Sequence, residues 1–233
     1  MGNLFVFEGL VKPYILATDS ARLKSKGKVW HKSLMKEGIV PCSGIDTEAK
    51  WGYSRTKGWV FGYKLHMICS TDLSSTIIPL SADVTTANIS DKPVYTDVLS
   101  DLFPEILRKI HFMVADPGFS GKKLYDLSLK KGFQLVCPVR EYKNTPVERL
   151  KLVDFYESAL GQVIYSRRRI SIEPLIEHIK SVFRIDPVPV RGLENVRGII
   201  LLVVSLYQII IYYNCKVLKN NNPRRDIKYM IGC

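Results

Sequence analysis

The sequence has few of the residues that build disulfide frameworks or zinc sites. Its 233 residues include five cysteines and four histidines, and no two cysteines form a CxxC pair. The cysteine count is odd, and most of these residues stand in apolar runs: Cys42, Cys69, Cys137, Cys215 and Cys233. This pattern argues against a disulfide-stapled secreted protein and against a zinc centre. It predicts reduced, buried thiols in a cytosolic protein.

A cationic start followed by a long apolar run is also missing. The N-terminus, MGNLFVFEGLVKP, therefore does not resemble a signal peptide. The apolar run from Gly198 to Asn214 is shorter than the ~20 residues that a bilayer core needs. Ser205 and Gln208 interrupt it as well. We interpret the run as a buried helix, with membrane anchoring as the alternative.

Acidic residues are scarce relative to basic ones. Lys and Arg number 34 against 22 Asp and Glu, which gives a net charge of +12. Such a balance favours a polyanionic partner, because each neutralised phosphate releases a condensed counterion. A basic surface that binds nothing is the alternative. Charge and pattern together favour nucleic acid as the partner.

The most basic part of the chain is a turn-rich segment from about residue 21 to 60, which we interpret as an insertion. Aromatic residues are interleaved with its cations: Trp30, Trp51, Tyr53 and Trp59. Cations alternating with rings are typical of surfaces that stack nucleotides. The alternative is that the rings pin the segment to the core.

Around this segment, strand-like and helix-like runs alternate. Strands are expected at 14–18, 62–70, 74–84, 111–115 and 133–139, and helices at 90–102, 120–131, 165–183 and 198–214. The second and third strands look like a hairpin. This order predicts an α/β fold, a mixed sheet flanked by helices, in one domain over 1–218. Residues 219–233 are predicted to be a basic, flexible tail.

Three acids stand where such a fold would gather them. Asp19 and Asp116 each follow a strand-like run, and Glu173 lies on an Arg-rich helix. Carboxylates at strand ends meet at one edge of a sheet, and hard oxygen ligands suit Mg²⁺ or Mn²⁺. Two such ions could activate an attacking oxygen and stabilise the leaving oxygen of a phosphodiester. Each acid also has a simpler explanation, as a cap, a turn former or a helix ion pair.

The sequence resembles the DDE transposases of prokaryotic insertion sequences, in the group with a Tyr-Arg-Glu-Lys signature. Arg169, Glu173 and Lys180 have the expected intervals, while Tyr165 has the right interval to Arg168 instead. Two further blocks resemble the family, VADPGFSGKKLYDL around the second acid and the upstream IDTEAKWGYSRTKGWVFGYKLHMI. The Asp-Ser pair at 19–20 fits the family's first acid better than the Asp-Thr pair at 46–47.

The resemblance implies a ribonuclease-H-like core that cuts transposon ends and joins them to target DNA. It implies that Asp19, Asp116 and Glu173 are catalytic and hold Mg²⁺, for which Mn²⁺ substitutes. The predicted DNA contacts are basic or aromatic: Lys64, Tyr165, Arg167, Arg168, Arg169 and Lys180. The partners implied are terminal inverted repeats, target DNA and a second copy of the chain, as a homodimer or larger assembly.

Relatives of this group usually carry an N-terminal region that helps to recognise the transposon ends. The chain begins only one expected strand before Asp19, so a truncated copy, a split reading frame or a catalytic domain served by another chain are alternatives. Two other functions stay open. One is a catalytically silent DNA-binding remnant, and the other is a ribonuclease-H-fold nuclease that cuts DNA without joining it.

Overall fold

The computed structural model describes residues 2–54, 58–71, 76–139, 147–220, 222–224, 227 and 231. These residues cluster into two compact units. The first unit comprises Met1–Asp19, Met67–Ser81 and Asp91–Leu175, and the second comprises Ser20–His66, Ala82–Ser90 and Ile176–Cys233. Each unit is described by itself. The single domain expected over 1–218 stays a prediction.

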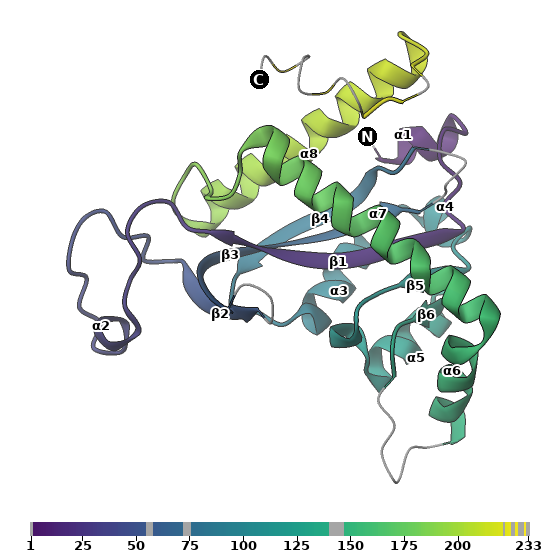
Figure 1. Ribbon diagram of the computed structural model, residues 1–233, viewed down its shortest axis with the longest axis horizontal. Helices are drawn as coiled ribbons and strands as arrows, with labels where there is room; N and C mark the ends of the chain where they lie inside the picture. Colours follow the sequence, from purple (N-terminus) through teal and green to yellow (C-terminus); the bar gives the residue numbers. More distant parts are fainter. Residues whose placement is uncertain are drawn as a thin grey trace. The chain divides into compact units, whose positions relative to one another are not determined.

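The first unit contains three parallel strands (Figure 1): β1 (Ile15–Lys24), β5 (Phe112–Val114) and β6 (Gln134–Val136). β1 starts in this unit and continues into the second. Met113, Val114, Leu135 and Val136 are all buried, because strands of a parallel sheet are covered on both faces. The strands expected over 111–115 and 133–139 are thereby confirmed.

Helices complete the first unit: α1 (Gly2–Phe7), α3 (Asp91–Ser100), α4 (Pro104–Leu107), η1 (Pro117–Phe119), α5 (Lys122–Lys130) and α6 (Val147–Glu157). Helix α7 (Ala159–Phe183) begins in this unit and continues into the second from Ile176. α3 begins at Asp91 as expected, and Pro93 is tolerated in its first turn. Ser120 does not cap α5. Gly121 is the N-cap residue, and Ser120 closes the short helix η1 instead. Gly132, at φ +90°, follows the end of α5.

The second unit contains β2 (Lys50–Ser54), most of β3 (Gly58–Ser70), the end of β4 (Pro79–Thr86), α2 (Lys32–Lys36) and α8 (Leu193–Lys216). β2 and β3 are antiparallel. The strand order is β2-β3-β1-β5-β6, and β4 also pairs with β3. The predicted mixed sheet with helices is confirmed. The turn of the predicted β3–β4 hairpin lies outside the described residues.

Two sequence predictions about the basic segment are corrected. The strand expected to end before Asp19 continues to Lys24. The predicted insertion over 21–60 also includes β2 and the start of β3. The reason is that few of these strand residues are buried, so polar and basic side chains conceal the strands. Arg55 and Lys57 of this segment lie outside the described residues.

Helix α8 is amphipathic, not buried on all sides. Val196, Ile200 and Val204 are buried, whereas Leu202 and Ile209 are exposed. Its 24 residues and mean hydropathy of 1.9 would suffice to cross a membrane, so the argument from length fails. A core helix of a soluble protein passes the same test, and only 39% of the apolar window is buried. The helix is therefore weak evidence for a membrane span.

Two of the four described cysteines are buried, and two are half-buried. Cys69 and Cys137 belong to the first group, Cys42 and Cys215 to the second, and all four are free thiols. The expectation of buried, reduced thiols thus holds for half of them. Cys233 and most of the tail from 221 onward lie outside the described residues.

Candidate active site

Two of the three predicted acids lie at the same level of neighbouring parallel strands. Ala17 of β1 pairs with Val114 of β5, and Asp19 and Asp116 each stand two residues further along. Residues two apart share a strand face, and paired strands lie about 4.8 Å apart. Asp116 follows the end of its strand as predicted, whereas Asp19 lies inside β1. The sheet register thus brings both residues to one region of the first unit.

The third acid, Glu173, is linked to Asp19 through an arginine of the same helix. Arg168 Nη2 lies 2.7 Å from Asp19 Oδ2, and Arg168 Nη1 lies 2.7 Å from Glu173 Oε1. Such short contacts are typical of charge-assisted hydrogen bonds. The simpler explanation left open for Glu173 was a helix ion pair with Arg169 or Lys180. The observed partner is five residues away, which the usual helical spacings do not cover.

Opposing electrostatic effects act on the pKa of Arg168. Burial lowers the pKa of Arg168, but the charges of Asp19 and Glu173 raise it by more, so the net shift is upward. The side chain is only 15% exposed, and its Nε is buried without a hydrogen-bond partner. A permanent positive charge is therefore held between two carboxylates. This geometry favours Arg168 over the exposed Arg169 as the arginine of the signature.

Asp116 has a different set of contacts. Its Oδ1 accepts a hydrogen bond from Gly118 N at 2.7 Å, so it caps η1. Two cations that sequence reasoning missed lie beside this turn. Lys92 donates to the Ser120 carbonyl at 2.7 Å, and Arg149 donates to Ser120 Oγ at 3.4 Å. No spacing rule could have found them, because they come from α3 and α6.

These acids have the donor chemistry of a magnesium or manganese site. The carboxylates of Asp19 and Glu173 converge on one positive group, so a cation fits between them. Within the described ranges, however, no three His, Cys, Asp or Glu side chains form a group that could hold a metal ion. The structure thus brings Asp19 and Glu173 together through Arg168 and leaves Asp116 as a cap.

Tyr165 and Arg167, on the same helix as Arg168, are two further predicted DNA contacts. Tyr165 is half-buried, and its ring meets Tyr156 edge-on with 5.1 Å between centroids. Burial raises the pKa of Tyr165 to about 12, against the opposing effect of Arg168, so the phenol keeps its proton at neutral pH. Arg167 donates to the Thr71 carbonyl at 3.3 Å. Arg167 is half-buried, and Arg169, two positions along and also a predicted DNA contact, is exposed.

The remaining predicted contacts, Lys64 and Lys180, belong to the second unit and are buried. Lys180 Nζ lies 3.1 Å from both Glu177 Oε1 and Asp186 Oδ2. Lys64 is 3% exposed, and its amine donates to the Ile89 carbonyl at 3.3 Å. Neither ammonium group is presented to a phosphate in this conformation. Their role as DNA contacts stays a prediction.

Residues of the Gly-Tyr-Lys-Leu-His block from Gly62 to His66 make packing and polar contacts inside the second unit. A Cβ at Gly62 would lie 2.1 Å from the Leu23 carbonyl oxygen, so only glycine fits. Tyr63 OH donates to Asp46 Oδ2 at 2.7 Å. Burial and this hydrogen bond raise the pKa of Tyr63 strongly. Asp46 is 2% exposed and also accepts from Gly192 N, so it serves packing, consistent with Asp19 as the first acid.

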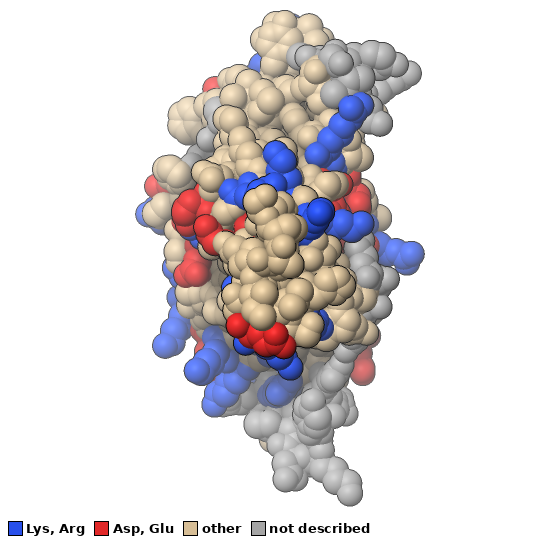
Figure 2. Space-filling view, turned by 90° about the vertical axis from the view of Figure 1, so that its left-hand side faces the viewer, with Lys and Arg blue, Asp and Glu red and all other residues tan. Residues whose placement is uncertain are grey.

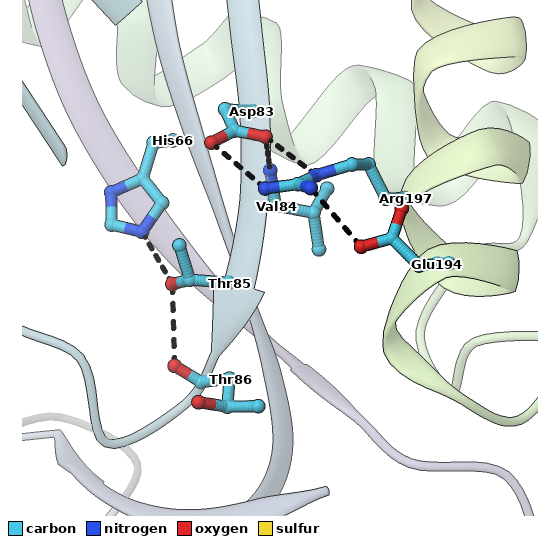
Figure 3. Close-up of polar contacts among 7 residues, drawn as sticks. All are labelled: His66, Asp83, Val84, Thr85, Thr86, Glu194 and Arg197. Carbon is cyan, nitrogen blue, oxygen red and sulfur yellow. Dashed lines mark hydrogen bonds and ion pairs between the residues drawn. The ribbon is translucent and has the colours of Figure 1, made fainter. Parts of the chain in front are cut away.

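The last residue of the block fastens the end of β4 (Figure 3). His66 Nε2 lies 2.9 Å from Thr85 Oγ1, which in turn donates to the Thr86 carbonyl. Beside it, Arg197 of α8 contacts Asp83 at 2.9 and 3.4 Å (Figure 3). Polar contacts in this unit therefore connect a helix and two strands. Arg197 Nη1 also lies 3.2 Å from Glu194 Oε1 (Figure 3), so Arg197, like Arg168, contacts two carboxylates.

Residues 12–209 match the family model described as Transposase DDE domain. The chain belongs to this family. DDE transposases generally use divalent metal ions. No curated protein matches the chain in sequence.

Three solved structures are similar to this DDE domain. One is a piggyBac transposase synaptic complex with hairpin DNA, at 16% identity and TM-score 0.35, covering 64% of this chain and 28% of that chain. Another is a simian T-cell lymphotropic virus intasome in complex with PP2A regulatory subunit B56 gamma, at 11% identity and TM-score 0.40, covering 95% of this chain and 56% of that chain. The third is a Mos1 transposase paired-end complex with the left transposon end, at 9%, TM-score 0.29, and 72% and 55% coverage. The chain thus spans from about a quarter to just over half of these proteins, and the family assignment rests on the sequence match.

Proposed function

We propose that the protein is a DNA transposase that cuts phosphodiester bonds at transposon ends and joins them to target DNA. Asp19, Asp116 and Glu173 are the proposed catalytic acids. The observation that carries this proposal is the bridge from Arg168 to Asp19 and Glu173, with Asp116 at the level of Asp19 on the next strand. The match to the DDE family supports the same three residues.

The three acids are also the proposed ligands of Mg²⁺, for which Mn²⁺ would substitute. A bound divalent cation would neutralise charge on the phosphodiester and lower the pKa of an attacking hydroxyl. The carboxylates of Asp19 and Glu173 already converge on a positive group, which supports a cation there. Asp116 would contribute through its carboxylate once the bond to Gly118 N is given up.

The cations of this region are proposed to hold the DNA backbone. Arg168 has a planar fork that binds carboxylate or phosphate in the same way, so it can exchange one for the other. Tyr165 keeps its proton and can donate a hydrogen bond to a phosphate oxygen. Arg167 and Arg169 on the same helix, with Lys92 and Arg149 near Asp116, add positive charge for the flanking phosphates.

The proposed partners are the terminal inverted repeats and target DNA. A net charge of +12 supports binding to a polyanion. Two ends must meet during transposition, so we propose a homodimer or larger assembly on DNA. The protein would act in the cytoplasm, on DNA of the nucleoid.

The test is a cleavage assay on a plasmid that carries the gene's own flanking ends, with Mg²⁺ or Mn²⁺ or with EDTA. We expect metal-dependent nicks at the ends, followed by joined products, and neither with Asp116→Asn. Cutting without joining would indicate a ribonuclease-H-fold nuclease. Binding without cutting would contradict the enzyme and favour a silent remnant.

A further inference from the structure

The hairpin of β2 and β3 carries an aromatic surface that the proposed cleavage chemistry does not use. Trp51 pairs with Phe61, and Tyr53 pairs with Trp59. Residues two apart share a strand face, so the four rings lie on one side of the hairpin. The ring centroids are 5.5 Å apart in the first pair and 5.4 Å in the second. We call these four residues the aromatic face.

A pocket of about 720 Å³ opens beside this face, within the second unit. Its lining includes aromatic, cationic and acidic side chains: Arg22, Lys24, Trp51, Trp59, Phe61 and Asp186. The volume falls within the range of about 300–1,000 Å³ that is usual for small-molecule sites. A single nucleotide is therefore a suitable occupant in size.

Part of the aromatic face is fixed, and part is open to solvent. Trp51 Nε1 donates to the Trp30 carbonyl at 2.8 Å, and Trp30 Nε1 donates to the Ile39 carbonyl at 2.8 Å. By contrast, Trp59 is 57% exposed and Tyr53 is 56% exposed. Pinning the segment to the core explains the buried Trp30. It does not explain two large rings that face water.

Positive charge surrounds the aromatic face. The ammonium of Lys32 lies 5.3 Å from the ring centroid of Trp51 and 2.9 Å from that of Trp59. Arg22 and Lys24 line the pocket, and its one acid, Asp186, is already bonded to Lys180 and to Lys24 N. The segment from 25 to 49 adds exposed lysines on the side of the molecule shown in Figure 2. A ligand with flat neutral rings and negative charges matches both features.

We propose that this pocket binds an unpaired stretch of DNA. A base would stack on Trp59 and Trp51, and the adjoining phosphates would lie near Arg22, Lys24 and Lys32. Bases of a duplex have both faces covered by their neighbours, whereas an unpaired base offers a free face to an aromatic ring. Lys32 is exposed and flexible, so it can leave the ring for a phosphate. The inference rests on the proposed function for the choice of DNA.

The test is fluorescence anisotropy with a labelled oligothymidine strand and a hairpin duplex of matched length, in EDTA to prevent cleavage. Trp59→Ala should weaken binding of the single strand about tenfold, because stacking of one base contributes that much. It should change binding of the duplex less than about twofold. Phe103→Ala is the matched control, because Phe103 is 53% exposed and lies in the first unit. It should change neither affinity.

A second variant guards against misfolding of Trp59→Ala. Lys24→Gln keeps the backbone N–H that bonds Asp186, and should lower the salt slope for the single strand by about 0.7. Equal losses in Trp59→Ala and Phe103→Ala, or an unchanged slope with Lys24→Gln, would overturn the proposal. Tight binding of a peptide or protein at Trp59 without any binding of DNA would overturn it as well.

The outcomes separate this proposal from the transposase function. Asp116→Asn should retain binding of the single strand, because Asp116 belongs to the other unit. Binding that depends on Trp59 in a protein without cleavage would support the pocket and contradict the enzyme. Cleavage at the ends together with unaltered binding by Trp59→Ala would support the enzyme and contradict the pocket.

Discussion

Helix α7 carries two cations, each held between two carboxylates, and they differ in what surrounds them. Arg168 joins Asp19 to Glu173, whose side chain is 45% exposed. Lys180 joins Glu177 to Asp186 and is itself only 5% exposed. Asp186 also accepts the backbone N–H of Lys24. The first cluster therefore connects the proposed catalytic side chains, and the second ties the helix to a strand backbone.

The difference indicates that residues of one sequence signature can have very different surroundings. Arg168 and Glu173 have partners that could exchange for a metal ion or a phosphate, because both contacts are between side chains near the surface. Lys180 is buried beside its partners, so moving away from them would leave a buried charge unpaired. The intervals of the signature alone do not distinguish the two cases.

The largest expected effect separates the acids of the first unit from ordinary surface acids. Asp116→Asn should reduce the rate of end cleavage by about a thousandfold or more, because a lost metal ligand removes several kcal/mol of charge stabilisation. Binding to DNA should remain. Asp126→Asn, an exposed acid of α5, is the control and should cut at the normal rate. A similar loss in both variants would remove the distinction.

The next effect concerns Lys180 and stability. Lys180→Met should lower the free energy of unfolding by about 3 kcal/mol, because it leaves Asp186 without its charged partner. Urea titration measures this change, with the exposed Lys123→Met as the control. The salt slope of DNA binding should stay constant. If Lys180→Met instead lowered the salt slope of DNA binding by about one and left stability unaltered, Lys180 would be a phosphate contact, as predicted from the sequence.

A buried thiol beside Asp116 gives the first unit its own pH dependence. Burial raises the pKa of Cys137 from 9.0 to about 11. Between these values the unfolded thiol ionises while the folded one stays neutral, so stability falls as pH rises. The fall should reach about 2 kcal/mol near pH 11. Urea titrations at several pH values should show this contribution in the wild type and not in Cys137→Ala.

The smallest effect tests the fork of Arg168. Arg168→Lys keeps the charge but cannot donate two hydrogen bonds in one plane to Asp19 and Glu173. Cleavage should slow about tenfold, the value of one charge-assisted hydrogen bond. Stability should change by less than about 1 kcal/mol, because lysine keeps a positive charge beside Asp19 and the Glu173 side chain is 45% exposed. Arg169→Lys, one position along, should have little effect. Equal rates in the two variants would argue that Arg168 is not the signature arginine.

The strands and helices with one apolar pattern could be predicted from the sequence. β5, β6, α3 and α5 have continuous or periodic apolar residues, and their positions were right to within a few residues. β1 and β2 were missed in whole or in part. Their alternating residues are cations or exposed rings, which look like a loop.

The site was predictable as a set of residues but not as a set of contacts. Asp116 followed its strand as expected, because a buried apolar run ended there. The bridge from Arg168 to Asp19 joins residues 149 positions apart, and its second bond spans five residues of one helix. Neither distance follows from a local rule. Tertiary packing decides which of two adjacent arginines turns toward the acids.

The most direct test of the account compares two glutamates on one helix. Glu173 contacts Arg168 in the proposed catalytic region, and Glu177 contacts Lys180 in the structural cluster. The rate of metal-dependent cleavage of the plasmid should fall by about a thousandfold with Glu173→Gln and stay near normal with Glu177→Gln. Equal rates for the two variants would contradict the assignment of the Arg168 cluster as the catalytic centre.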